Sequence, residues 1–385
     1  MPQLIGTAPN QVPTNGDLGS AAYMDTSAFY GTGLNPVFRN RIINGDMRID
    51  QRNAGNSVTT SVLQGTTYTV DRWSYYNDVI SKRTIQQSSV APPGFKTSLK
   101  VTVIATDTVG PQQFIRQAFE GYTIADLNWG TANAQPAVLS FWVRSSIVGQ
   151  HGGAIQNSNT DQVYPFAYTI NVADTWEYKT ITIPGPTAGT WSNTTNGLVV
   201  GIQFEHGVGY QKAPANAWIA QNATSSTGSV NLCATNGATW YITGVQFEKG
   251  TVATPFEYRP FGTELAMCQR YFVAFGTPTN NQYVHLGTGS LYTATSVNLA
   301  IALPVSMRAT PTLQPVPNGT PAWLQVYVGS AGVNSNGTPE IGEYLSTGSN
   351  TIRMYVPSSY SGGTAGQGTW CQVMNGAQLR ISAEL

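Results

Sequence analysis

The most informative feature of this 385-residue sequence is its shortage of charge. Charged residues make up only 10% of the chain, whereas ordinary globular proteins have roughly 25%. Lys and Arg together number 19, which equals the number of Asp and Glu. A sparse and balanced charge offers no basic surface for nucleic acid or for an anionic membrane. We therefore expect neither partner.

Cysteine and histidine are also scarce. The three cysteines form no CxxC pair and no cluster with histidine: Cys233, Cys268 and Cys371. An odd number of widely spaced thiols argues against a disulfide framework, and we expect ordinary buried cysteines. The three histidines are equally scattered: His151, His206 and His285. Because zinc ligands cluster in sequence or space, no metal site is predicted from these residues.

Long apolar runs and common catalytic motifs are missing as well. No stretch approaches the roughly 18 apolar residues of a membrane-spanning helix, so we expect no membrane insertion. The opening segment, MPQLIGTAPNQVPTNG, lacks the pattern of a signal peptide, which predicts a chain made in a reducing cytoplasm. There is no GxSxG motif, and the run GGTAGQG lacks the strand and helix that flank a phosphate-binding loop.

Apolar, aromatic and small polar residues are abundant in place of charged ones. Apolar residues make up 41% of the chain, which is ample for hydrophobic cores. Segments with alternating or continuous apolar residues are strand candidates: 35–55, 66–77, 98–107, 114–122, 137–146, 165–172, 178–184, 198–207 and 240–250. Turn signals separate them, and no helical run of ten residues precedes residue 263. This pattern predicts an all-β protein built as a β-sandwich.

The segment 240–272 marks the end of this sandwich. It begins with strand alternation that slips by one residue at Gly244, which predicts a β-bulge. The run 263–270 is compatible with a short helix, with Thr263 as the expected N-cap. Three parts are therefore predicted: an extended N-terminal arm at 1–34, a sandwich at 35–262 and a smaller C-terminal β-sandwich at 263–385.

Carboxylates offer the main route to enzyme chemistry. Glycoside hydrolysis needs two carboxyl groups about 5–10 Å apart. The candidates by residue type are Asp71, Glu120, Asp126, Glu205 and Glu248. The last two occupy the same place in the repeated phrases GIQFEHG and GVQFEKG. Ion pairing with Arg116, Arg144 or Arg259 accounts for them more simply than catalysis, so we expect no enzyme.

Aromatic residues outside the strand alternation suggest sugar binding. They lie in Gly-, Asn- and Thr-rich segments: Trp129, Trp191, Tyr210 and Trp218. The second sandwich has a similar set: Tyr283, Trp323, Tyr344, Tyr360 and Trp370. Exposed rings stack on the C–H faces of sugars while neighbouring amides bind hydroxyl groups. The alternative is that these rings cover the ends of the sandwiches. A Ca²⁺ ion held by a carboxylate such as Asp46 or Asp71 is a further hypothesis.

Several phrases resemble a known family. NPVFRNRIINGDMRIDQRNAG, TYTVDRW, IRQAFEGY, LSFWVRSS, TWEYKTITIPGPTAGTW and WYITGVQFEKGTVATPFEYRP are similar to a carbohydrate-binding-module-like jelly roll of tailed-bacteriophage proteins. TELAMCQRYF, SMRATPTL and RISAEL resemble the adjoining C-terminal domain of phage fibres, and IGTAPNQVPTNGDLGSAAYMDTSAF resembles segments that precede the jelly roll.

The resemblance implies a virion component made in the host bacterial cytoplasm and displayed on the phage particle. Such proteins are commonly homotrimeric fibres that bind host-surface glycan. We expect residues 1–34 to attach to a tail or capsid protein, and Leu265, Met267 and Tyr271 to form the trimer seam. The glycan candidates are Trp129, Trp191, Tyr210, Trp218, Trp323 and Tyr360. Capsid decoration or a head fibre is the alternative, and a tailspike depolymerase is a weaker one.

Overall fold

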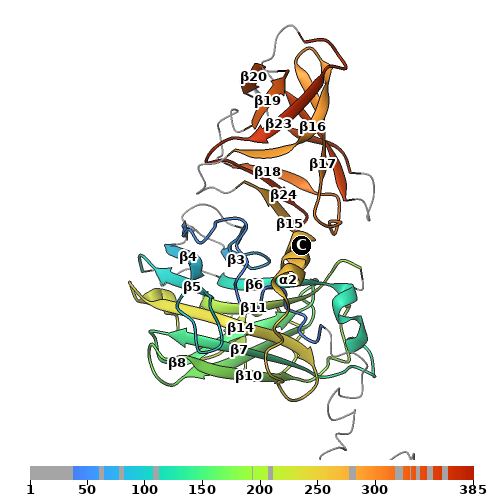
Figure 1. Ribbon diagram of the computed structural model, residues 1–385. Coiled ribbons are helices and arrows are strands. Elements are labelled where there is room, and N and C mark those ends of the chain that lie inside the picture. The colour runs from blue at the N-terminus through green and yellow to red at the C-terminus, as the bar shows by residue number, and fades with distance from the viewer. Residues whose placement is uncertain are drawn as a thin grey trace, which may run out of the picture. The chain divides into compact units, whose positions relative to one another are not determined.

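The structure, a computed structural model (Figure 1), describes most of the chain beyond residue 37. The described residues are 38–59, 65–77, 82–106, 112–192, 194–206, 211–276, 283–316, 324–329, 331–334, 339–344, 350–357 and 363–385. The arm predicted at 1–34 lies outside them, as do Tyr210, Trp323 and Tyr360. The chain divides into the units Met1–Arg39 and Asn40–Leu385, and all described strands and helices belong to the second.

Two antiparallel sheets of six strands each form the first sandwich. Sheet A has the order β1 (Val58–Thr59), β4 (Arg83–Ser88), β5 (Ser98–Val103), β14 (Thr239–Lys249), β7 (Ala137–Ser145) and β10 (Glu177–Ile183). Sheet B has the order β2 (Gly65–Tyr68), β3 (Ser74–Asn77), β6 (Gln112–Glu120), β11 (Asn196–His206), β8 (Gly149–Gln156) and β9 (Val163–Ile170). Between β6 and β7 lies the 3₁₀ helix η1 (Gly121–Leu127).

The chain crosses between the sheets repeatedly, which is the topology of a jelly roll. Strands β5, β7, β10 and β14 belong to sheet A, and the intervening β6, β8, β9 and β11 belong to sheet B. One apolar core joins the inner faces, with Phe141 and Phe247 from sheet A and Ile115, Ile202 and Phe204 from sheet B. The segment between β11 and β14 adds the short strands β12 (Gln211–Ala213) and β13 (Ser225–Ser226) and the 3₁₀ helix η2 (Leu232–Ala234).

A second sandwich follows with its own core. A three-stranded sheet has the order β15 (Phe272–Phe275), β24 (Gln378–Ser382) and β18 (Thr312–Val316). A seven-stranded sheet has the order β20 (Ala331–Asn334), β19 (Leu324–Val328), β23 (Gly368–Val373), β16 (Val284–Thr293), β17 (Ser296–Ala302), β22 (Thr351–Pro357) and β21 (Glu340–Tyr344). The prediction of an all-β chain with a jelly roll and a second sandwich is confirmed.

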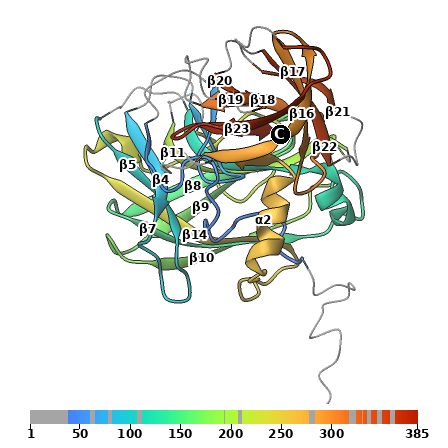
Figure 2. The ribbon, with the colours of Figure 1, turned by 45° about the horizontal axis from the view of Figure 1, so that its top comes forward.

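Helix α2 (Phe261–Gln269) connects the two sandwiches and is the coiled ribbon beside the strands in Figure 2. Its N-cap is Pro260, with no side-chain capping bond, so the prediction of Thr263 as N-cap is wrong. Proline suits this place because its missing N–H needs no partner at a helix start. Among the described helices, none is long and apolar enough to cross a membrane.

Residues 40–50 do not form the expected strand. Asn44 and Met47 both have φ of 58°, a left-handed conformation that breaks strand geometry. The segment is still part of the core because Ile42 and Met47 are fully buried. The buried Asn44 side chain holds the loop by hydrogen bonds to the backbone of Ile49 and Asp71. The turn pair Asn44–Gly45 thus correctly predicted a turn here, whereas the strands expected on either side of it do not form.

Strand β8 was not predicted because its sequence, GQHGGAIQ, is rich in glycine. Its glycines are required by close packing within sheet B. A Cβ atom on Gly153 would lie 2.5 Å from the ring of Phe166 and 2.3 Å from the carbonyl oxygen of Gly201. Glycine in a strand interior commonly marks such a close approach.

Ion pairs link the two sandwiches. Glu120 at the end of β6 accepts hydrogen bonds of 2.9 Å from Arg270, just after α2. Near the C-terminus, Glu384 pairs with Arg52 at 2.7 Å and also contacts Arg72. Because Glu384, Arg52 and Arg72 are all at least nine-tenths buried, removing one partner would leave a buried charge uncompensated. These pairs hold the second sandwich against the first.

Candidate functional site: the outer face of sheet A

Three of the predicted glycan-binding tryptophans lie together, but as a packed cluster. The ring of Trp129 is 4.9 Å from that of Trp191 and 5.5 Å from that of Trp218, measured between centroids. Trp129 is only 5% exposed, and the other two are half-buried against the core. Each indole N–H donates to a backbone carbonyl at 2.6–3.1 Å.

The expectation of an exposed ring is therefore wrong for Trp129. Its indole packs edge-on against Phe247 of the core, at 6.1 Å between centroids. Trp191 and Trp218 pack on it, so the cluster covers one end of the sandwich, which was the alternative left open by the sequence. Whether either half-buried ring also contacts a ligand stays a prediction.

The candidate carboxylates are held by partners within the chain. Asp126 pairs with Arg41 at 2.7 Å, and Glu120 pairs with Arg270 as described above. Glu248 is 3% exposed and accepts from the backbone and hydroxyl of Thr254, at 2.8 and 2.7 Å. The expected ion pair of Glu248 with arginine is thus wrong. The side chain of Glu205 lies outside the described residues.

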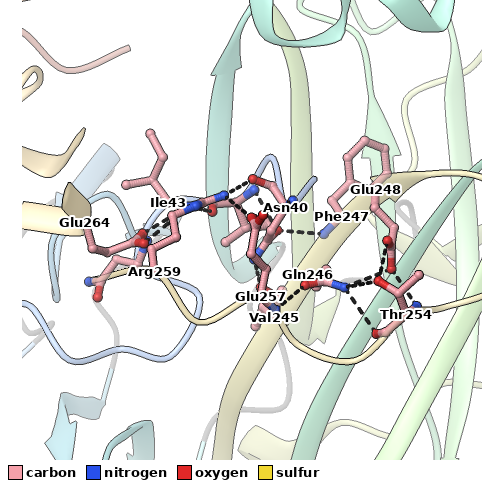
Figure 3. Close-up of polar contacts among 12 residues, drawn as sticks. Asn40, Ile43, Val245, Gln246, Phe247, Glu248, Thr254, Glu257, Arg259 and Glu264 are labelled. Carbon is pink, nitrogen blue, oxygen red and sulfur yellow. Dashed lines mark hydrogen bonds and ion pairs between the residues drawn. The ribbon is translucent and has the colours of Figure 1, made fainter. Parts of the chain in front are cut away.

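A buried polar network surrounds Glu248 at one end of sheet A. Figure 3 shows the side chains of Gln246, Glu248 and Thr254 pointing toward one another. Gln246 is fully buried and donates to Glu248 at 2.8 Å, while its carbonyl accepts from the backbone N–H of Glu257 at 2.9 Å. The segment that follows β14 thus folds back over the outer face of its own strand and seals it.

The same return segment is anchored by Arg259. Its guanidinium donates to Glu264 at 3.3 Å and to the carbonyl of Ile42 at 3.1 Å, and it also contacts the carbonyl of Asn40 (Figure 3). The buried Asn40 side chain in turn bridges the backbone of Val245 and Phe247 on β14, each at 3.0 Å. The polar side chains at this end of the outer face are therefore engaged in bonds within the chain.

The rest of the outer face of sheet A is open and aromatic. On β7, Phe141 and Val143 point into the core, so Trp142 lies on the outer face. Tyr178 on β10 is the cross-strand partner of Trp142, and their ring centroids are 5.4 Å apart. Tyr178 is 43% exposed, which leaves much of its ring accessible.

The aromatic surface extends across β14 at Gly244, where rings from both sides approach the backbone. The predicted β-bulge is confirmed, since the pairing of β14 with β7 shifts register between Thr243 and Gln246, and Gly244 has φ of 62°. A Cβ atom on Gly244 would lie 2.6 Å from the ring of Phe95 and 3.2 Å from that of Trp142. The two rings therefore flank the bare backbone of Gly244.

The surface ends at a group of rings beyond β14. Phe95 lies 5.6 Å from Tyr258 and 5.1 Å from Phe256, between ring centroids. Tyr258 is 57% exposed, and its hydroxyl donates to the carbonyl of Gly94 at 3.0 Å. We call the row Tyr258, Phe95, Trp142 and Tyr178 the aromatic strip.

The aromatic strip was missed by sequence reasoning, which looked for rings outside the strand pattern. Trp142 and Tyr178 sit inside strands, in the polar phase of the alternation, where an exposed residue is expected. An aromatic ring in that phase is the signal that could have found them, because large apolar patches on a surface usually mark interaction sites. Phe95 and Tyr258 lie in loops, and only the fold brings them to the same face.

The outer face of sheet B is different in character. Arg116 on β6 lies over the rings of Tyr76 and Phe114, at 5.1 and 5.8 Å, and its guanidinium donates to Thr66 at 2.8 Å. Beside them on β11, Gln203 is 3% exposed, and in the part of the chain that the structure describes neither atom of its amide has a hydrogen-bond partner. Phe114 is 6% exposed, so this face offers little open aromatic surface.

The three residues expected to form the trimer seam differ in their exposure. Helix α2 buries Glu264 and Cys268, while Leu265 and Met267 are half-buried. Met267 lines a pocket of about 550 Å³ on the surface of α2. Tyr271 is 3% exposed, and its hydroxyl donates to Glu120 at 2.6 Å, so this side chain packs within its own chain. The seam stays a prediction for Leu265 and Met267.

The two carboxylates considered for Ca²⁺ have protein partners. Asp46 pairs with Arg48 at 3.2 Å. Asp71 is fully buried, accepts from the backbone and side chain of Gln51, and burial raises its pKa to about 7. Within the described ranges there is no group of three or more His, Cys, Asp or Glu side chains able to hold a metal. The Ca²⁺ hypothesis has not been tested.

Comparison with known proteins returns structural likeness only. No protein-family model matches the chain, and no curated protein matches it. Among solved structures, the enzymatically active domain of tailspike protein 4 from bacteriophage CBA120 is 13% identical, over 55% of this chain and 22% of that one, with a TM-score of 0.30.

Carbohydrate-binding modules give similar values. The CBM22-1 xylan-binding domain of Paenibacillus barcinonensis Xyn10C is 12% identical, over 52% of this chain and 99% of that one, with a TM-score of 0.27. A family 11 carbohydrate-binding module of Clostridium thermocellum is 14% identical, over 50% and 99%, with a TM-score of 0.24. Such values carry no argument about function. The assignment of a jelly roll therefore rests on the strand order of this chain.

Proposed function

We propose that this chain is a virion protein of a tailed bacteriophage, of the fibre or receptor-binding type, that adheres to host-surface glycan. The phage assignment is supported by the sequence resemblance. The adhesive role is supported by one observation above all, the aromatic strip on the open part of sheet A. Adhesion, not cleavage, is the proposed activity, because Glu120, Asp126 and Glu248 are all engaged within the chain.

The aromatic strip suits a polysaccharide chain. Sugar rings present apolar C–H faces that stack on Trp and Tyr, and the strip offers rings on both sides of Gly244. An exposed threonine, Thr180, follows Tyr178 on the same face of β10. Its hydroxyl group is suited to bind a sugar hydroxyl. An open sheet face of this kind accommodates the middle of a chain and not only its end.

Replacing rings of the strip tests this proposal. We expect Trp142→Ala and Tyr178→Ala each to weaken binding to host-surface polysaccharide by roughly tenfold, since one stacked ring contributes about 1–1.5 kcal/mol. The measurement is binding of the purified full chain to an array of bacterial surface polysaccharides. Thermal unfolding of each variant checks that the fold is retained.

Tyr292→Ala is a matched control, because Tyr292 is 63% exposed but lies on β16 of the second sandwich. It should bind like the natural chain. Failure of the natural chain to bind any polysaccharide, or full binding by both strip variants, would count decisively against the proposal. Release of reducing sugar ends from a bound polysaccharide would show catalysis instead of adhesion.

We also propose that the chain acts as a homotrimer joined along α2. Phe261 is 56% exposed there, and Leu265 and Met267 offer further apolar surface. Three weak sites on one particle reinforce one another through effective concentration. Leu265→Asp should therefore shift the chain from trimer to monomer in light scattering, because a carboxylate would be buried at the seam. A monomeric natural chain, or an unchanged trimer in the variant, would contradict this.

A further inference from the structure

Two cations lie beside the aromatic strip on the same face of sheet A. Tyr241 on β14 is paired across strands with Lys100 on β5 and with Arg144 on β7. The ammonium of Lys100 is 5.7 Å from the centre of the Tyr241 ring, and the guanidinium carbon of Arg144 is 5.2 Å from it. The row Lys100, Tyr241 and Arg144 is called the cationic row.

The cationic row runs next to the strip. Arg144 follows Trp142 by two residues on β7, so both side chains leave the same face about 7 Å apart. Tyr241 likewise precedes Thr243, the cross-strand partner of Trp142, by two residues. A sugar stacked on Trp142 therefore has Arg144 as its neighbour, and a polysaccharide continuing along the row meets Lys100 two strands away on β5.

The charges of the row are available to a ligand. Arg144 pairs with Asp174 at 3.2 Å, but the Asp174 side chain is 53% exposed, and such surface pairs contribute only about 0–1 kcal/mol. In the described part of the chain, no carboxylate forms an ion pair with Lys100. Its neighbour on β4 is Gln86, which is uncharged. Tyr241 itself is only 7% exposed, so the two cations, and not the ring between them, are the groups that the row offers to a ligand.

We propose that the ligand of the aromatic strip is an acidic polysaccharide, whose carboxylates bind Lys100 and Arg144 while its sugar rings stack on Trp142 and Tyr178. This inference rests on the proposed glycan binding and names the class of glycan. A carboxylate on the sugar replaces Asp174 as the partner of Arg144, and guanidinium–carboxylate pairing gives geometric specificity. A neutral glycan would leave both cations without a role.

The experiment compares each bacterial surface polysaccharide with a copy whose carboxyl groups have been reduced to alcohols. Linkage and stacking surface stay the same, and only the charge is removed. The natural chain should bind the native acidic polymers at least tenfold more tightly than the reduced ones, and added salt should weaken that preference. The double variant Lys100→Gln, Arg144→Gln should lose the preference but keep its affinity for the reduced polymers.

Lys82→Gln is the matched control, because Lys82 is an exposed lysine away from the row. It should keep the preference. Equal binding to native and reduced polymers would overturn this inference and leave the proposed function intact, whereas no binding to any polymer would overturn both. Equally tight binding of single-stranded DNA would show that the row recognises polyanions in general and would also overturn the acidic-glycan assignment.

Discussion

Strands β11 and β14 carry the same five-residue phrase, Gly-x-Gln-Phe-Glu, at 201–205 and 244–248, in the middle of opposite sheets. The phenylalanines are equivalent. Phe204 is 2% exposed and Phe247 is fully buried, and both belong to the core of the first sandwich. The outward-facing residues of the phrase have different surroundings on the two strands.

The glutamines differ most. Gln246 uses both ends of its amide, on Glu248 and Thr254 and on the backbone of Glu257. Gln203 is also buried, at 3% exposed, but its amide has no hydrogen-bond partner among the described residues. Glu248 lies on β14 itself, and the return segment after β14 supplies the other partners, Thr254 and Glu257. Local sequence alone therefore does not decide whether a buried amide is satisfied.

The glycines differ as well. Gly201 pairs regularly with Arg116 on one side and Ala154 on the other. Gly244 instead lies at the bulge, with a positive φ and the rings of Phe95 and Trp142 on its two sides. The bulge on β14 thus shapes the aromatic strip, whereas the register shift of β11 within the phrase comes later, between Gln203 and Glu205, and leaves Gly201 regularly paired. The comparison explains why the open aromatic surface is on sheet A.

Replacing the glutamines should give the largest difference. We expect Gln246→Leu to lower the free energy of unfolding by about 3 kcal/mol, because the backbone N–H of Glu257 loses its acceptor and one oxygen of the buried Glu248 carboxylate loses a donor. Gln203→Leu should be neutral or stabilising by about 1 kcal/mol, since it removes a polar group with no partner. Urea unfolding followed by tryptophan fluorescence measures both. An equal loss of unfolding free energy in the two variants would contradict the predicted difference between Gln246 and Gln203.

Replacing the glycines should give a smaller difference. Gly244→Ala should cost about 2 kcal/mol, because its Cβ would lie in a left-handed conformation and 2.6 Å from Phe95. It should also weaken polysaccharide binding by moving that ring. Gly201→Ala should change the free energy of unfolding by less than about 0.5 kcal/mol. The atom nearest to the new Cβ would be in the ring of Phe114, 3.4 Å away, which is an ordinary contact. Thermal unfolding and the polysaccharide array test the pair, and a tolerated alanine at Gly244 would refute the role of the bulge.

Much of the fold follows from local patterns in the sequence. Alternation predicted the strands that became β5, β10 and β14, because side chains of a strand point to opposite faces, and a nearly continuous apolar run predicted β7. Alternation failed at β8, where glycines needed for contact with Phe166 hide the pattern, and around the turn at Asn44, where the flanking residues do not form strands. The phase slip at Gly244 correctly predicted a bulge.

The candidate site was much less predictable. Trp129 was expected to be exposed because its segment is polar, yet the fold places it against Phe247. The aromatic strip joins Phe95, Trp142, Tyr178 and Tyr258 from four separate segments. Cross-strand register decides such contacts, and one sequence does not state which strands are neighbours.

The sequence by itself thus determined an all-β chain with two sandwiches, a helix between them and a bulge at Gly244, since all of these depend on short-range periodicity and glycine. Only the tertiary structure decided which rings are open, which glutamine is satisfied and which cations face Tyr241. Lys100, Arg144 and Tyr241 are far apart in the chain and meet only because β5, β14 and β7 are neighbours in sheet A. Burial and contact are properties of that arrangement, which is why the surface proposed to bind glycan became visible only in the fold.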